Sequence, residues 1–121
     1  MSIIMASEPS PELTPETAAA MLDTAKTERD LAELFAAVEN KSWWIEDNVY
    51  DYEPGTKEYI AACELTDQWF SLADRIKAKI FHILLNEGVQ IPDQGQITVL
   101  APFMKRNGYI NGDGWWIENN S

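Results

Sequence analysis

Two apolar stripes with helical spacing, separated by a single break, constrain the fold of this chain most strongly. The first stripe recurs at intervals of three, four and seven residues: Leu31, Leu34, Phe35, Val38, Ile45, Val49 and Tyr52. The second resumes the same period after the break: Tyr59, Ala62, Thr66, Trp69, Ala73, Ile76, Ile80 and Ile83. Such intervals place apolar side chains on one face of an amphipathic α-helix. The sequence therefore predicts two long helices, each with a buried face.

The break between the stripes consists of residues 54–56, Pro-Gly-Thr. A Pro-Gly pair favours a turn, and Thr56 is a good N-cap for the following helix. Thr27 and Asp30 resemble a capping box at the start of the first long helix, and Gly88 is expected to end the second. Because the helices are similar in length and their connection is short, we expect an antiparallel hairpin.

The N-terminal region predicts a tail followed by a short helix. Thr14, Pro15 and Glu16 form a helix start, because Thr caps free amides, Pro fits the first turn and Glu favours the positive helix end. We expect this helix over residues 15–25. Residues 1–13 contain two prolines and three serines without an apolar period, which predicts a flexible tail. The single folded domain is then expected at residues 14–121.

The residues after Gly95 change character and predict a small β element. Three apolar residues look strand-like: Ile97, Val99 and Leu100. Residues 102–107 fit one helical turn, and residues 111–114, Asn-Gly-Asp-Gly, indicate the turn of a hairpin. Because so short a hairpin is not stable alone, we expect it to pack on the helices. Candidate contact residues on the helices are Trp43, Tyr50, Phe70 and Phe81.

The predicted fold class is mainly α with a minor β part. It consists of a short N-terminal helix, an antiparallel helical hairpin and a small C-terminal β-hairpin packed on the helices. The second long helix should be central, because apolar residues flank its stripe on both sides. Long heptad-like stripes leave open whether the chain closes on itself or on a second copy in a homodimer.

Residue types that support catalysis or cofactor binding are scarce. His82 is the only histidine, and a helical register places no carboxylate beside it. Cys63 is the only cysteine and has no cation at neighbouring helical positions, which favours an inert thiol. Glycine loops of the phosphate-binding type do not occur in the sequence. We therefore expect a protein that is not an enzyme and holds no cofactor.

The segment from Asn107 to Glu118 fits the pattern of a calcium loop in part. Asn107, Asn111, Gly112 and Glu118 occupy suitable positions, whereas Tyr109 stands where the pattern requires an oxygen ligand. An ordinary glycine hairpin accounts for the same residues. The sequence therefore predicts no metal site, and cation binding at this turn stays an open alternative.

Charge is distributed unevenly along the chain. The 121 residues carry 20 acidic and 9 basic side chains, which gives a net charge of −11. Residues 1–74 hold 16 of the acidic and 4 of the basic side chains. This balance argues against direct binding to nucleic acid. An acidic helical face serves solubility, or it mimics the phosphates of a nucleic acid.

The densest acidic patch lies beside aromatic residues that are candidate interface anchors. The candidate partner-binding residues are Trp43, Trp44, Glu46, Asp47 and Asp51. We therefore predict a non-enzymatic protein-binding or regulatory module whose partner is another protein. The alternative is an acidic nucleic-acid mimic, of the kind that phages and mobile elements encode, which inhibits a nucleic-acid enzyme by occupying its basic binding surface.

Expectations about location follow from three features. The N-terminus lacks the charged and apolar regions of a secretory signal, and no apolar run approaches the roughly 20 residues that cross a bilayer. A single cysteine forms no internal disulfide, which fits a reducing compartment. We expect a cytoplasmic protein with no membrane partner.

Overall fold

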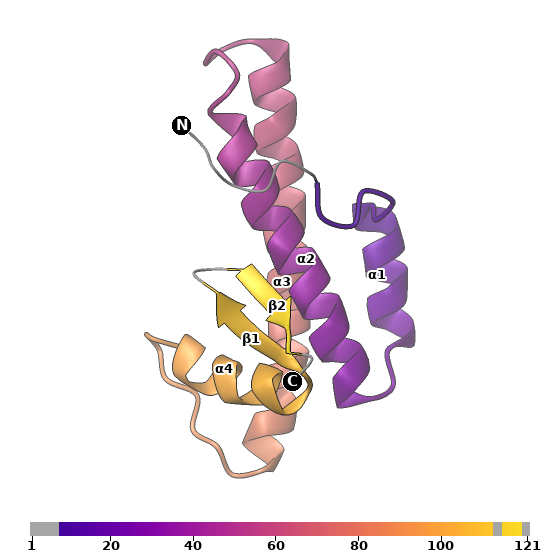
Figure 1. The fold of residues 1–121 in the computed structure, drawn as a ribbon, viewed down its shortest axis with the longest axis vertical. Helices are drawn as coiled ribbons and strands as arrows, with labels where there is room; N and C mark the ends of the chain where they lie inside the picture. The colour runs from indigo at the N-terminus through magenta and orange to yellow at the C-terminus, as the bar shows by residue number, and fades with distance from the viewer. Residues whose placement is uncertain (1–7, 113–114, 120–121) are drawn as a thin grey trace.

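The computed structural model describes residues 8–112 and 115–119 and is built on a helical hairpin (Figure 1). Helix α1 spans Pro15–Thr24, α2 spans Glu28–Val49 and α3 spans Lys57–Asn86. Helix α4 spans Ile97–Arg106, and a two-stranded antiparallel sheet follows, with β1 at Tyr109–Gly112 and β2 at Trp115–Glu118. The fold is therefore mainly α with a minor β part, as the sequence predicts.

Local sequence signals set the starts of the first three helices. The side chains of Thr14 and Thr56 cap α1 and α3. At the start of α2, the Thr27 hydroxyl accepts a hydrogen bond from the Asp30 amide, and the Asp30 carboxylate accepts from the amides of Lys26 and Thr27. These amides hold the pKa of Asp30 below its usual value, because they stabilise the charged form. The predicted capping box is confirmed.

The core lies between α2 and α3, which run antiparallel side by side, with α1 packed against both (Figure 1). The fully buried side chains include Phe35, Val38, Trp69, Ile76 and Ile80. The polar residues on the opposite face of α3 are exposed: Glu64, Asp67, Asp74, Arg75, Lys79 and His82. In the described part of the chain, no helix has an apolar stretch long enough to cross a membrane.

The strand predicted at Ile97, Val99 and Leu100 is wrong, because these residues form the first turn of α4. Leu100 and Met104 lie four residues apart and are both buried, so the segment satisfies a helical period. Burial of this helical face outweighs the β preference of the two β-branched residues.

The predicted hairpin is present and packs on α2 through β2. Its turn residues, 113 and 114, lie outside the described residues. Trp116 is buried, with its ring 6.0 Å from that of Phe35. The Asn40 side chain donates a hydrogen bond to the Trp116 carbonyl (2.9 Å) and accepts one from the Trp116 amide (2.8 Å). Asn40 thus takes the place that a neighbouring strand would occupy at the edge of β2.

The surface on α2 that receives the hairpin differs from the predicted one. Phe35 and Asn40 make the ring contact and the hydrogen bonds to Trp116. Trp43 packs instead edge-on against Phe70, and Tyr50 is 75% exposed. The contact to Trp116 is therefore made by an aromatic residue of the buried stripe, Phe35, and by an amide side chain that satisfies the edge of β2, and not by Trp43 or Tyr50.

Candidate protein-binding groove

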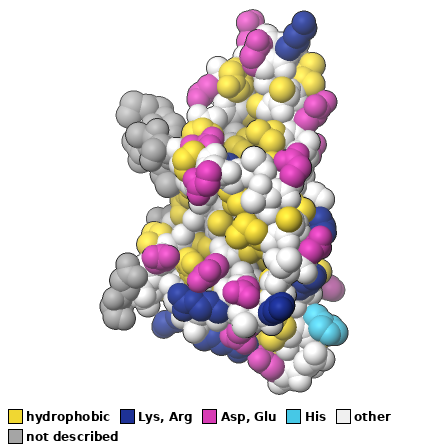
Figure 2. Space-filling model, turned by 90° about the vertical axis from the view of Figure 1, so that its right-hand side faces the viewer, with side chains coloured by type: hydrophobic (Ala, Val, Ile, Leu, Met, Phe, Trp, Pro, Cys, Tyr) yellow, Lys and Arg dark blue, Asp and Glu magenta, His cyan; other side chains and the backbone are white. Residues whose placement is uncertain are grey.

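An apolar groove of about 600 Å³ lies at the loop end of the hairpin, which we define as residues 43–66 around the α2–α3 connection. Its apolar lining comes from the residues around the start of α1 and from both long helices: Leu13, Pro15, Trp44, Ile45, Leu65 and Trp69. Ile45 and Trp69 are buried, whereas Leu65 is 37% exposed. In the upper half of Figure 2, apolar side chains reach the surface and Asp and Glu side chains flank them.

The surroundings of the groove are strongly acidic. Glu8 and Glu58 line the groove itself. Residues 43–66 carry six carboxylates, against one basic side chain, that of Lys57. Like charges at this density produce a negative potential that attracts cations and basic segments. The apolar groove is therefore set in the most acidic part of α2 and α3.

Lys41 holds the N-terminal segment against the groove. Its side chain is buried on α2, and its ammonium donates hydrogen bonds to the Glu8 carboxylate (2.9 Å) and to the carbonyl oxygens of Pro9 (3.2 Å) and Ser10 (2.9 Å). Three donors thus meet three acceptors, as a buried ammonium requires. Of the predicted tail, residues 1–7 lie outside the described residues, whereas residues 8–10 are held on α2 by Lys41.

The five candidate binding residues all lie at the loop end, but on different faces. Trp44 lines the groove. Trp43, which points about 100° away on the same helix, packs against Phe70 at 5.9 Å between ring centroids. Glu46 and Asp47 are half-buried on α2, and Asp51 is exposed in the loop. The structure therefore brings Trp44 alone of the five into the groove lining.

Sequence reasoning missed several groove residues for which a signal was present. Leu13 directly precedes the N-cap Thr14, the position of a hydrophobic staple, and it packs against the core. Lys41 lies three residues after Val38 and four before Ile45, inside the buried stripe of α2. A charged residue in a buried stripe indicates an internal partner. That partner, Glu8, is 33 residues away, and no local pattern identifies it.

The residues that sequence reasoning weighed for catalysis stand apart from the groove lining. His82 is exposed on α3. Cys63 is half-buried beside Tyr59, whose pKa it raises by its charge and by a hydrogen bond. Within the ranges 8–112 and 115–119, no group of three or more His, Cys, Asp or Glu side chains is arranged to hold a metal.

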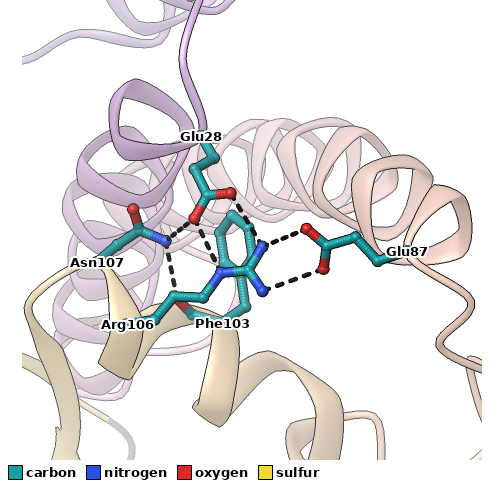
Figure 3. A network of polar contacts seen from close by, with 5 residues as sticks. All are labelled: Glu28, Glu87, Phe103, Arg106 and Asn107. Carbon is teal, nitrogen blue, oxygen red and sulfur yellow. Dashed lines mark hydrogen bonds and ion pairs between the residues drawn. The ribbon is translucent and has the colours of Figure 1, made fainter.

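A second polar cluster joins the opposite end of the hairpin to α4 (Figure 3). The Arg106 guanidinium donates two hydrogen bonds to Glu28 (both 2.9 Å) and two to Glu87 (3.0 and 2.9 Å). Its Cζ atom lies 5.0 Å from the Phe103 ring centroid. We call this cluster the Arg106 joint, because it connects the first turn of α2, the end of α3 and the last turn of α4.

Asn107, the first position of the calcium-loop pattern, belongs to the same joint. Its amide nitrogen donates to Glu28 and to the Phe103 carbonyl (both 2.9 Å). Hydrogen bonds from Arg106 and Asn107 lower the pKa of Glu28, because they stabilise its charged form. Two other residues of the pattern, 113 and 114, lie outside the described residues.

Comparison with known proteins returns no relative: no family model, no curated protein and no solved structure matches the chain. The geometry, burial and charge of the described residues are therefore the basis for a proposal of function.

Proposed function

We propose that this protein is a non-enzymatic module that binds another protein through the loop end of its helical hairpin. The observation that carries this proposal is the apolar groove that opens among the carboxylates of residues 43–66. Apolar surface with a polar rim is typical of sites that bind other proteins. A groove of this kind gains most of its binding energy from burial of apolar anchors and its selectivity from charge.

The exposed side chains of the loop end support the same function. Trp43, Tyr50 and Tyr52 are exposed there, as is the groove residue Leu65. Tyr and Trp are enriched among residues that dominate binding energy at interfaces. In Figure 1 the connection between α2 and α3 extends beyond α1, α4 and the sheet.

The acidic charge supports nucleic-acid mimicry as a second candidate function. A mimic would place its carboxylates in the basic channel of a nucleic-acid enzyme, as phosphates are placed there. The two functions make different demands on the loop end. A mimic depends on Glu46, Asp47 and Asp51 and loses affinity steeply as salt rises, whereas a groove depends on its apolar lining and is less sensitive to salt.

A capture experiment with matched variants tests the proposed function. The full chain is immobilised, incubated with extract of its source cell, and the retained proteins are identified by mass spectrometry. Leu65→Lys changes the groove, and Leu85→Lys makes the same change at a 56% exposed position at the other end of α3. We expect one partner to bind the wild type and Leu85→Lys and to be lost from Leu65→Lys.

The same experiment identifies the contrary results. The mimic would be supported, in place of the groove, by a partner that still binds the Leu65→Lys variant but does not bind the variant that combines Glu46→Gln, Asp47→Asn and Asp51→Asn. A partner that binds all the variants equally would contradict both functions.

A further inference from the structure

We infer that the groove takes an amphipathic, positively charged α-helix of the partner protein. This inference rests on the proposed function and names the chemistry of the ligand. The groove is lined by the antiparallel helices α2 and α3 and by the residues around the start of α1. A further helix packs against a pair of helices through side chains spaced three, four and seven residues apart. Its volume, about 600 Å³, is in the range of sites that enclose a few large side chains.

The backbone of the groove favours a helical ligand over an extended one. An extended peptide needs partners for its own amides and carbonyls, and it usually obtains them from the edge of a sheet. At the groove, α2 and α3 use their backbone groups in their own helices, and in the segment before α1 the carbonyls of Pro9 and Ser10 accept hydrogen bonds from Lys41. A helical ligand satisfies its backbone internally and presents only side chains to Trp44, Leu65 and Trp69.

The charges around the groove require basic residues on the ligand. Glu58 lines the groove, and the loop end carries five more carboxylates. Lys41 does not offset this charge for an incoming ligand, because it is 3% exposed and is already paired with Glu8. Figure 2 shows Asp and Glu side chains beside the apolar surface, so Lys or Arg next to the apolar anchors of the ligand would meet carboxylates there.

Labelled synthetic peptides of about 18 residues test this inference, a length that spans the anchor spacing of a groove-bound helix. The first carries Leu at intervals of three and four with Lys elsewhere, the second has the same composition in scrambled order, and the third carries Glu in place of Lys. Fluorescence anisotropy gives each affinity for the full chain at low salt. We expect the first peptide to bind at least roughly tenfold more tightly than either control, because it alone matches both groove and charge.

Two substitutions on α3 separate the groove from the charge around it. Leu65→Lys changes the groove lining, and Ile60→Lys adds the same charge nearby at a 51% exposed position outside that lining. We expect Leu65→Lys to weaken the first peptide at least about tenfold and Ile60→Lys to weaken it by less than about threefold. Equal losses in both variants, or equal binding of the scrambled peptide, would overturn the inference and leave an acidic surface that attracts any basic chain.

Failure of the inference is distinguishable from failure of the proposed function. If a captured protein depends on Leu65 but the amphipathic peptide does not bind, the proposed function stands and the ligand is not a basic helix. If sedimentation shows a dimer that Leu65→Lys dissociates, a second copy of this chain is the occupant, and the inference is likewise overturned.

Discussion

At the scale of single residues, Lys41 is a charged side chain in a buried position. Its ammonium is buried, and three oxygen atoms of residues 8–10 accept its hydrogen bonds. One of these acceptors, the Glu8 carboxylate, supplies the only opposing charge among the three. An ammonium that loses its counter-charge in a buried site keeps the cost of its desolvation.

Replacement of Glu8 by Gln should therefore destabilise the folded chain. The variant keeps an acceptor oxygen opposite Lys41 but removes the negative charge, and we expect the free energy of unfolding to fall by about 1–2 kcal/mol in urea titrations. Glu12→Gln is the matched control, because Glu12 is exposed in the same segment. Equal stability of the two variants would show that the charge of Glu8 does not hold the segment.

Glu39 is the carboxylate whose pKa is raised by burial. The Trp116 indole N–H donates to it at 3.3 Å and opposes this effect, as does the charge of Lys77. The unfolded chain ionises Glu39 near 4.5, whereas the folded chain holds the proton to higher pH. Stability is therefore lost as pH rises from the unfolded pKa through the folded pKa, and the loss is complete above the latter.

Glu39→Gln should accordingly stabilise the protein at pH 7. The Gln side chain keeps an acceptor for the Trp116 indole and never ionises. We expect urea titrations to give a higher unfolding free energy for the variant at pH 7, with an advantage that shrinks as pH falls from the folded pKa towards the unfolded value of 4.5 and is absent below it. Glu64→Gln, on the exposed face of α3, serves as the control. A variant less stable than the wild type at pH 7 would contradict this account of the burial.

At the scale of elements, the Arg106 joint connects three helices through one planar side chain. Guanidinium offers donors in a fixed fork that meets both carboxylates at once, and an ammonium cannot reproduce this geometry. Arg106→Lys should therefore lower the free energy of unfolding by about 1 kcal/mol. The effect is modest because Arg106, Glu28 and Glu87 are each 37–40% exposed in their side chains, so water screens the pairs.

The pH dependence of the joint gives the same prediction a second readout. The pKa of Glu28 is lowered in the folded state, so its contribution is present above the unfolded value of 4.5 and is lost as pH falls through the folded pKa. The stability difference between wild type and Arg106→Lys should shrink over that acidic range. Lys105→Gln, one residue away and exposed, is the control, and a difference independent of pH would contradict the role of Glu28.

Elements whose signals are local could be predicted, and those set by distant contacts could not. Thr14, Thr27 and Thr56 mark their helices because a cap and its amide lie within three residues. The strand predicted from Ile97 is wrong, because packing against other elements decides between helix and strand there.

The binding site follows from the sequence only in part, because its residues come together through distant contacts. The acidic loop end is visible in the sequence, whereas its groove needs Leu13 brought beside Leu65 and Trp69.

At the scale of the whole molecule, the two ends of the hairpin are supported differently. One end is covered by α1, α4 and the sheet and is tied by the Arg106 joint. The other end consists of α2, α3 and the residues that Lys41 holds. In α3 the first buried residue is Thr66, nine residues after the helix begins. Sparse burial of this kind lowers the local free energy of opening, which would suit the proposed binding of a partner helix there.

Hydrogen exchange should reveal this difference along the two long helices. Amides of residues 58–64 in α3 should exchange at least roughly tenfold faster than those of residues 72–80, where Leu72, Ile76 and Ile80 are buried. The amphipathic basic peptide should slow exchange at the loop end and leave residues 72–80 unchanged, because it contacts only the groove. Mass spectrometry of exchanged peptides measures both effects. Uniform protection along α3 would contradict this expectation. The loop end would then be as rigid as the core, and a ligand would bind the groove without local opening.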